Sequence, residues 1–423
     1  MDKIRVVLFS LFLSFVFSGI FAQTVLQQAL PVAAKISADR LQRIDALIRE
    51  NVDKNLISGA IGFIARDGKV IYNKAIGYSD IETKTPLKTT DIFRIASQTK
   101  AITSVAVMML FEEGKFLLDD PISKYIPAFA KPTVLDKFNP SDSTYTTVPA
   151  KREITIRDLL THTSGIDYAV IGSANMKAIY AKSNIPPGFG STGIVLKTEM
   201  EKLGKLPLLH QPGERFTYGL NSDVLGYLVE LASGMSLDKF FAERIFKPLA
   251  MNDTYFYLPA SKHSRLIPIY TFNEKNKLVK YERNGVITAD YPNSNGTYFS
   301  GGAGLSSTIG DYAIFLQMLL NGGTYNNKRF LSRRTVDLMT MNQIGDLSLR
   351  GDKFGLGFQI TSKENMAKLG LTEGSFAWGG YFGTTYWVDP KEKIVALIYI
   401  QQSPLKSDIH DKFRALVYQS LND

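Results

Sequence analysis

The distribution of apolar residues predicts two regions of β-sheet, one near each end of the chain. Residues 60–65 and 70–78 are β-rich runs on either side of the turn Arg66-Asp67-Gly68-Lys69. Residues 376–388 and 394–401 form a second pair of predicted strands, joined by Asp389-Pro390-Lys391-Glu392. We therefore expect one antiparallel sheet that is assembled from both ends of the chain.

Helical spacing of apolar residues is present on both flanks of these strands. Leu41, Ile44, Leu47 and Ile48 recur at intervals of three or four, which predicts a helix over residues 39–54 that lies on the sheet. A closing helix is expected over about 408–421. Residues 97 to about 342 are mostly helical and rich in loops. The predicted fold class is α+β, with a sheet lobe over about 36–95 plus 350–423 and an inserted, mainly helical lobe over about 96–349.

The first 22 residues have the pattern of a secretory signal. Lys3 and Arg5 precede the apolar stretch 6–17, and the small residue Ala22 stands before Gln23. An uncleaved anchor is the alternative, but the apolar stretch is short for a membrane span. With no cysteine in the chain, neither a lipid-modified cysteine nor a disulfide is possible. We expect a periplasmic or secreted protein without stable membrane insertion after cleavage.

Composition narrows the possible partners. The 423 residues carry a net charge of +9, and loss of Asp2, Lys3 and Arg5 with the leader leaves +8. The excess cations are scattered, and no basic block is interleaved with aromatic residues, which argues against nucleic-acid binding. The four histidines show no metal-ligand spacing. We therefore expect no metal and no cofactor, and a small molecule as the substrate.

A candidate nucleophile stands at the head of an apolar helical run. Ser97 and Lys100 lie at positions i and i+3, so a helix that begins at about Ser97 would bring their side chains to one face. An ammonium group beside a hydroxyl favours its deprotonation, and a neutral lysine could take the proton itself. The same spacing at Ser236-Lys239 and Ser403-Lys406 is explained by ordinary caps or loops, so the spacing alone does not establish the chemistry.

Six stretches in order carry a specific resemblance. They are residues 91–100 (DIFRIASQTK), 159–165 (LLTHTSG), 211–218 (QPGERFTY), 300–308 (SGGAGLSST), 354–357 (FGLG) and 378–380 (WGG). Together they resemble the serine β-lactamase-related family, class C-like, and within it the family VIII carboxylesterases. The resemblance covers nearly the whole mature chain and implies the β-lactamase/transpeptidase-like fold.

The resemblance also implies roles for individual residues. The family's nucleophile falls on Ser97, its helix lysine on Lys100 and its second-motif tyrosine on Tyr218. The third motif falls on Trp378-Gly379-Gly380, and the implied oxyanion hole is formed by the backbone N–H groups of Ser97 and Tyr381. Either Tyr218 or Lys100 could be the general base. His162 belongs to a family motif, and we expect it to have a structural hydrogen-bonding role.

Two departures from the β-lactamase pattern favour an esterase. Trp378 stands where class C β-lactamases usually have a lysine, so a cation that would bind an anionic β-lactam is replaced by an aromatic wall. The asparagine usual two residues after the tyrosine is missing. Asn221 is one residue late, and it is either a substitute substrate-binding group or the N-cap of the next helix.

The expected activity is hydrolysis of carboxylic esters through an acyl-enzyme on Ser97. A class C-like β-lactamase or a D-amino-acid peptidase is the nearest enzymatic alternative. A penicillin-recognising domain that acylates slowly, or never turns over, is the non-enzymatic one. Because the serine, lysine and tyrosine that the chemistry requires are all present as Ser97, Lys100 and Tyr218, the sequence favours an enzyme.

Overall fold

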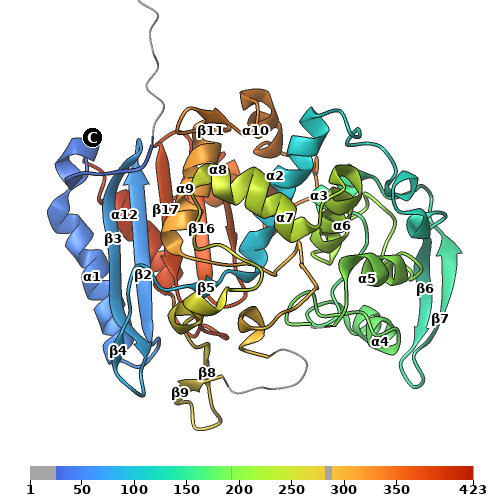
Figure 1. Cartoon of the computed structure of the whole chain (residues 1–423), viewed down its shortest axis with the longest axis horizontal. Coiled ribbons are helices and arrows are strands. Elements are labelled where there is room, and N and C mark those ends of the chain that lie inside the picture. The colour runs from blue at the N-terminus through green and yellow to red at the C-terminus, as the bar shows by residue number, and fades with distance from the viewer. Residues whose placement is uncertain (1–24, 192, 282–287, 423) are drawn as a thin grey trace, which may run out of the picture.

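A nine-stranded sheet forms the left-hand part of the protein in the view of Figure 1. The computed structural model describes residues 25–191, 193–281 and 288–422, so the predicted leader, residues 1–22, lies outside the described residues. The strand order is β1-β3-β2-β17-β16-β15-β14-β13, and β4 pairs with β3. N-terminal strands therefore occupy one side of the sheet and C-terminal strands the other, as the two apolar regions predicted.

The two ends of the chain join where β2 pairs with β17 in antiparallel fashion, with Phe63 opposite Leu397. The only parallel pair in the order above is β1 with β3. The strands of the sheet are β1 (Gln27–Gln28), β2 (Gly59–Arg66), β3 (Lys69–Asp80), β4 (Thr85–Pro86), β13 (Lys353–Phe354), β14 (Gln359–Ile360), β15 (Phe376–Gly379), β16 (Thr384–Asp389) and β17 (Ile394–Tyr399).

The segment predicted as one strand over residues 376–388 is instead a hairpin. β15 ends at Gly379 and β16 begins at Thr384. The Gly380 N–H donates to Thr384 O at 2.7 Å, and Gly383 adopts a φ of +82°. The single-strand prediction was wrong because glycines here close a turn, which apolar patterning does not reveal.

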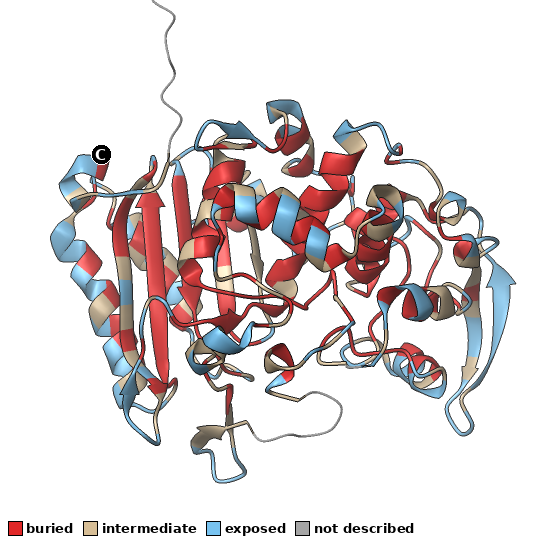
Figure 2. Ribbon diagram, viewed as in Figure 1, coloured by how far each residue is buried: buried red, intermediate tan, exposed pale blue. Residues whose placement is uncertain are grey.

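Helices cover both faces of the sheet. α1 (Ala38–Asp53) and α12 (Ile409–Gln419) pack on one face around Ile64 and Trp387. α2 (Thr99–Glu112) and α9 (Ile309–Leu320) share a core with Phe63 on the other. The central strands are consequently buried on both faces (Figure 2).

The rest of the inserted lobe is helical, as predicted, but it also carries an unpredicted and largely exposed hairpin, β6–β7, at the far edge of the molecule (Figures 1 and 2). α9 belongs to the insertion in sequence, yet it packs on β17. The remaining elements are β5 (Phe93–Arg94), β6 (Thr133–Asn139), β7 (Thr144–Pro149), α3 (Ile156–Leu160), α4 (Ala174–Lys182), α5 (Leu196–Leu203), α6 (Asn221–Ser233), α7 (Leu237–Phe241), α8 (Lys247–Leu249), β8 (Tyr270–Phe272), β9 (Leu278–Lys280), β10 (Ser306–Ser307), β11 (Thr324–Tyr325), β12 (Lys328–Arg329), α10 (Arg333–Met339) and α11 (Lys363–Leu369).

Candidate active site

Ser97 lies in a tight turn between β5 and α2. A single 3₁₀ turn, Ala96–Gln98, leads into α2 at Thr99, so the expected helix start is within two residues of the observed one. Ala96 has a φ of +43°, a left-handed conformation that is uncommon for alanine and is often found at functional sites. The turn leaves Ser97 only half-buried, at the wall of a pocket.

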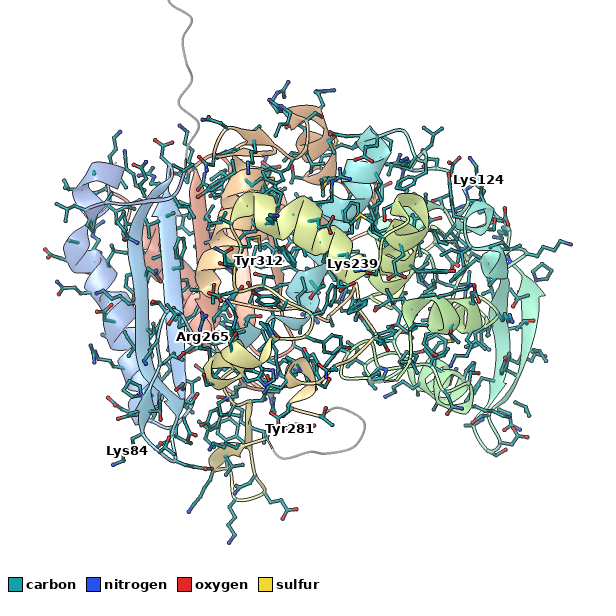
Figure 3. All side chains as sticks on the ribbon, viewed as in Figure 1. Lys84, Lys124, Lys239, Arg265, Tyr281 and Tyr312 are labelled. Atoms are coloured by element: carbon teal, nitrogen blue, oxygen red, sulfur yellow. The ribbon has the colours of Figure 1, made fainter. Side chains whose placement is uncertain are left out.

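Buried hydrogen bonds hold this turn against the sheet. The Tyr399 hydroxyl donates to Gln98 Oε1 at 2.7 Å, and the Tyr312 hydroxyl donates to Gln98 O at 2.8 Å. Tyr312 comes from α9, in the interior of the molecule (Figure 3). The Arg94 guanidinium donates to Ile267 O at 2.7 Å. Because these partners come from several elements, the position of Ser97 depends on the whole fold.

Lys100 is buried beneath Ser97 and contacts three acceptors. Its Nζ lies 3.3 Å from Ser97 Oγ, 2.8 Å from the Tyr168 hydroxyl and 2.7 Å from Gly302 O. An ammonium group has three donors, and these contacts use all of them. The predicted Ser97–Lys100 contact is therefore present in the structure. Tyr168 was not predicted from the sequence, because it follows the LLTHTSG stretch by three residues and has no spacing that links it to Lys100.

Two tyrosines flank Lys100, and they differ in environment. Tyr168 is buried, and burial raises its pKa well above 10, with Tyr218 and Asp223 adding to the effect. Tyr218 lines the pocket, and its ring centroid lies 4.6 Å from Lys100 Nζ. The Trp378 indole N–H lies 3.3 Å from the Tyr218 hydroxyl. Tyr168 therefore remains protonated, whereas Tyr218 is the tyrosine that faces the pocket.

A buried carboxylate, also missed from the sequence, lies close to Lys100. Asp223 Oδ1 accepts from Ser300 Oγ at 2.7 Å and from the Tyr298 hydroxyl at 3.3 Å. Burial raises the pKa of Asp223 to about 6. A Cβ atom at Gly302 would lie 2.5 Å from Asp223 Oδ2 and 3.5 Å from Lys100 Nζ. The carboxylate and the ammonium thus face the same glycine.

The third predicted motif forms the opposite wall. Trp378, Gly379, Gly380 and Tyr381 all line the pocket with Ser97. At Gly380 a Cβ atom would lie 2.4 Å from Ile95 O, so only glycine lets the end of β15 approach the Ser97 turn this closely. No described residue accepts a hydrogen bond from the Tyr381 N–H. That group therefore remains available to a ligand.

Asn221 is not at the pocket. It is fully buried, its amide oxygen accepts from Ser164 Oγ, and its Nδ2 lies 2.9 Å from His162 Nδ1. It is the first residue of α6, whose N-cap is Leu220, so the N-cap expectation was wrong. Because Asn221 stands three residues after Tyr218 and not two, its side chain lies in the protein interior. There it binds His162, whose ring packs 4.9 Å from that of Tyr218.

The pocket beside Ser97 has a volume of about 400 Å³ and walls that are largely apolar and aromatic. Its lining residues are Ser97, Ile171, Phe216, Tyr218, Leu349, Arg350, Gln359, Trp378, Gly379, Gly380 and Tyr381. This mixture of aromatic walls and a few polar groups is typical of small-molecule sites. In the part of the chain that the structure describes, no three His, Cys, Asp or Glu side chains gather as a possible metal site.

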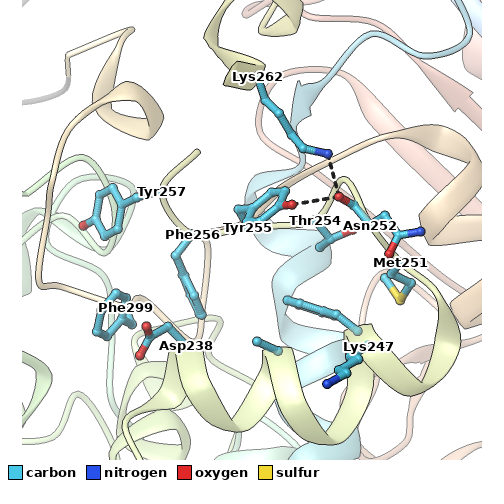
Figure 4. Close-up of a pocket in the computed structure, with 12 residues that line it drawn as sticks. Asp238, Lys247, Met251, Asn252, Thr254, Tyr255, Phe256, Tyr257, Lys262 and Phe299 are labelled. Carbon is cyan, nitrogen blue, oxygen red and sulfur yellow. Dashed lines mark hydrogen bonds between the residues drawn. The ribbon is translucent and has the colours of Figure 1, made fainter. Parts of the chain in front are cut away.

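A larger cavity of about 530 Å³ lies beside α7 and α8 (Figure 4). Its walls include Phe256 and Phe299, and Lys262 at its edge is ion-paired with Asp253. The residues that line it include no serine, cysteine or histidine. The larger cavity therefore contains no counterpart of the Ser97–Lys100 pair, so we place the candidate chemistry in the smaller pocket.

Comparisons with known proteins identify the family of this chain. The Beta-lactamase family model matches residues 44–419. Protein Rv1367c of Mycobacterium tuberculosis is 36% identical over 375 residues, covering 85% of this chain and 89% of that protein. Esterase EstB of Burkholderia gladioli is 28% identical over 373 residues, covering 85% and 90%.

Solved structures share the fold. The structure of EstCE1, described as a hydrolase with promiscuous acyltransferase activity, has a TM-score of 0.78 at 24% identity and covers 93% of this chain and 100% of its own. Simvastatin synthase (LovD) from Aspergillus terreus has a TM-score of 0.75 at 24% identity, covering 90% and 98%. The family match spans the sheet and the inserted lobe alike, and the chain therefore belongs to the Beta-lactamase family of hydrolases.

Proposed function

We propose that this protein is a serine hydrolase that cleaves carboxylic esters through an acyl-enzyme on Ser97. The observation that carries the proposal is the contact of Lys100 Nζ with Ser97 Oγ, 3.3 Å, at the wall of an aromatic pocket. Ser97 Oγ attacks the ester carbonyl carbon, and its proton passes to a base that returns it to the leaving alcohol. Water then hydrolyses the acyl-enzyme by the same steps.

In this proposal Tyr218 is the base and Lys100 acts as a cation. Gly302 O accepts a hydrogen bond from Lys100 Nζ, and the Asp223 carboxylate lies nearby, so both neighbours hold Lys100 Nζ in place beneath Ser97. Tyr218 faces both Lys100 Nζ and the pocket, so it is the tyrosine that a bound substrate can reach. The backbone N–H groups of Ser97 and Tyr381 would stabilise the oxyanion.

Trp378 supports an ester as the substrate. Its indole, together with Phe216 and Tyr381, gives the pocket apolar area that favours the acyl chain of an ester by burial. A cation at position 378 would instead favour the anionic group of a β-lactam. The name of the relative Esterase EstB agrees with this assignment.

Parallel turnover of p-nitrophenyl butyrate and a chromogenic cephalosporin tests the proposal. We expect rapid release of p-nitrophenol and much slower cephalosporin opening, with both reactions abolished in Ser97→Ala. The serine side chain caps no helix, so this variant should stay folded. Dominant cephalosporin turnover would identify a β-lactamase. A burst of one equivalent without turnover would identify a binding domain. Full activity of Ser97→Ala would place the nucleophile elsewhere.

We also propose export to the periplasm or the medium, based on the leader at residues 1–22. None of the helices in the described ranges has the length and apolar character of a membrane span. Cations such as Lys84 and Lys124 lie at opposite ends of the molecule, which agrees with a dispersed charge and not with a nucleic-acid surface (Figure 3). N-terminal sequencing of the exported protein should find a first residue near Gln23. A protein that still begins with residues 1–22 would contradict cleavage.

A further inference from the structure

The pocket beside Ser97 contains one charged side chain, Arg350. The other ten lining residues include no carboxylate. No described residue forms an ion pair or a hydrogen bond with the Arg350 guanidinium. By contrast, Arg157 binds Asp119 through two nitrogens, and Arg152 likewise binds Asp158. An unpaired guanidinium at the wall of a binding pocket is a group suited to a carboxylate on the ligand.

The backbone at Arg350 is unusual for an arginine. Arg350 and Gly351 are the two central residues of a tight turn in which Leu349 N–H donates to Asp352 O at 2.8 Å and Asp352 N–H donates to Leu349 O at 3.0 Å. Their φ angles are +55° and +92°. Asparagine, aspartate or glycine normally occupies the first of these positions, because other residues are strained there. This turn carries the Arg350 side chain to the wall of the pocket.

The turn is fixed firmly to its surroundings. Asn365 Nδ2 donates to Arg350 O at 3.1 Å. Asp352 is buried and accepts from the Ser362 N–H at 2.9 Å and from Gln359 Nε2 at 2.5 Å. Gln359 itself lines the pocket. The backbone of Arg350 is therefore held at the pocket wall, while its exposed guanidinium remains free to bind a ligand.

We infer that Arg350 is a specificity-determining residue that binds a carboxylate carried by the ester substrate. The inference rests on the proposed ester hydrolysis and narrows its substrate class. The aromatic walls accommodate an apolar chain, and Arg350 accommodates an anionic group at the end of it, so the preferred substrate is an ester with one free carboxylate. Class C β-lactamases usually have a lysine at the position of Trp378. Arg350 is a cation from a different part of the chain.

Two matched ester pairs test the inference. Mono-4-nitrophenyl adipate and 4-nitrophenyl hexanoate differ by a carboxylate on the acyl chain. 4-Carboxyphenyl hexanoate and phenyl hexanoate differ by a carboxylate on the leaving group. In at least one pair, Arg350→Gln should lower kcat/KM for the anionic ester by about fivefold or more, because KM rises. The same variant should change kcat/KM for the neutral ester by less than about twofold. Arg350→Lys should retain most of the preference.

Arg350→Asn is the matched control for the turn. Asparagine suits the left-handed position, so this variant should be at least as heat-stable as the wild type and should still lose the preference. The inference would be overturned if the ratio of kcat/KM for the anionic ester to kcat/KM for the neutral ester were unchanged in both pairs, which includes an equal loss of kcat/KM on both members of each pair. In that case, Ser97-dependent hydrolysis of the neutral esters would still uphold the proposed function. Hydrolysis of no ester at all would overturn both.

Discussion

The ammonium of Lys100 lies closer to the hydroxyl of Tyr168, at 2.8 Å, than to the hydroxyl of Ser97, at 3.3 Å. Tyr168 is buried and protonated, so it is a fixed neutral partner for the lysine. The lysine is therefore held by a residue of the inserted lobe and does not depend on Ser97 alone for its position. We expect Tyr168 to be a positioning residue, and Tyr218, which faces the pocket, to transfer the proton.

Phenylalanine substitutions should separate these two tyrosines. Tyr218→Phe removes the proposed base and should lower kcat for p-nitrophenyl butyrate by about a hundredfold or more. Tyr168→Phe removes one contact of Lys100, so it should cost about tenfold and displace the pH–rate profile. Steady-state kinetics from pH 5 to 10 measure both effects. Near-normal turnover of Tyr218→Phe would leave Lys100 as the base.

A double-mutant cycle tests whether Lys100 and Tyr218 act as a unit. Lys100→Ala should be as damaging as Tyr218→Phe, because the lysine would stabilise the phenolate. The double variant should then be little worse than either single variant. Single-turnover acylation rates are the appropriate measurement. Fully additive losses would show that the two groups act independently.

Asp223 should make the free energy of unfolding depend on pH. Its pKa is raised from 3.8 to about 6 in the folded protein, so the folded state holds the proton more tightly than the unfolded state. Stability from this group is therefore present below about pH 4 and is lost as the pH rises through 6, by about 3 kcal/mol. Asp223→Asn should lack this loss in urea unfolding measured from pH 4 to 7.

Asp311 provides the control for that prediction, since burial raises its pKa to about 6 as well. It lies in the first turn of α9, where it accepts from the Asp253 N–H at 2.7 Å. Asp311→Asn should also flatten the pH dependence of stability, but only Asp223→Asn should alter the pH–rate profile. An equal effect of both variants on kinetics would remove the proposed influence of Asp223 on Lys100.

Gly380→Ala should damage both stability and catalysis. The added Cβ would lie 2.3 Å from Thr384 Oγ1 and 2.4 Å from Ile95 O, so β15 must move away from the Ser97 turn and carry the Tyr381 N–H with it. We expect a stability loss of about 2 kcal/mol and a kcat at least about tenfold lower. Gly310→Ala, where a Cβ would meet nothing within 4 Å, is the matched control; because Gly310 lies in α9, it should leave kcat unchanged and should not lower stability.

Trp378→Lys should shift the substrate preference toward anionic β-lactams. The new ammonium could form a charge-assisted hydrogen bond worth about 1.5–3 kcal/mol, while the apolar area of the indole is lost. The ratio of cephalosporin to p-nitrophenyl butyrate turnover should rise by about tenfold or more. Trp378→Leu keeps an apolar wall without a charge and should not raise it. Efficient cephalosporin turnover by the wild type would refute the argument from the missing cation.

Much of the fold could be predicted from the sequence, because the relevant signals are local. The short β-rich apolar runs at residues 60–65 and 394–401 and the spacing of Leu41, Ile44 and Ile48 identified strands and a helix within a few residues. The position of the hairpin between β15 and β16 was not predicted, since a glycine run is compatible with a strand or a turn until its hydrogen-bond partners are known.

The sequence by itself determined the nucleophile candidate, its lysine and the motifs around them, because Ser97 and Lys100 are only one helical turn apart. Only the tertiary structure decided which other groups surround that lysine. Tyr168 and Gly302 lie 68 and 202 positions away along the chain. Arg350 reaches the pocket through a strained turn of the sheet lobe, and Asn221 leaves it because one residue on a helix changes direction by about 100°. Such placements depend on how distant elements pack together, and no local spacing encodes them.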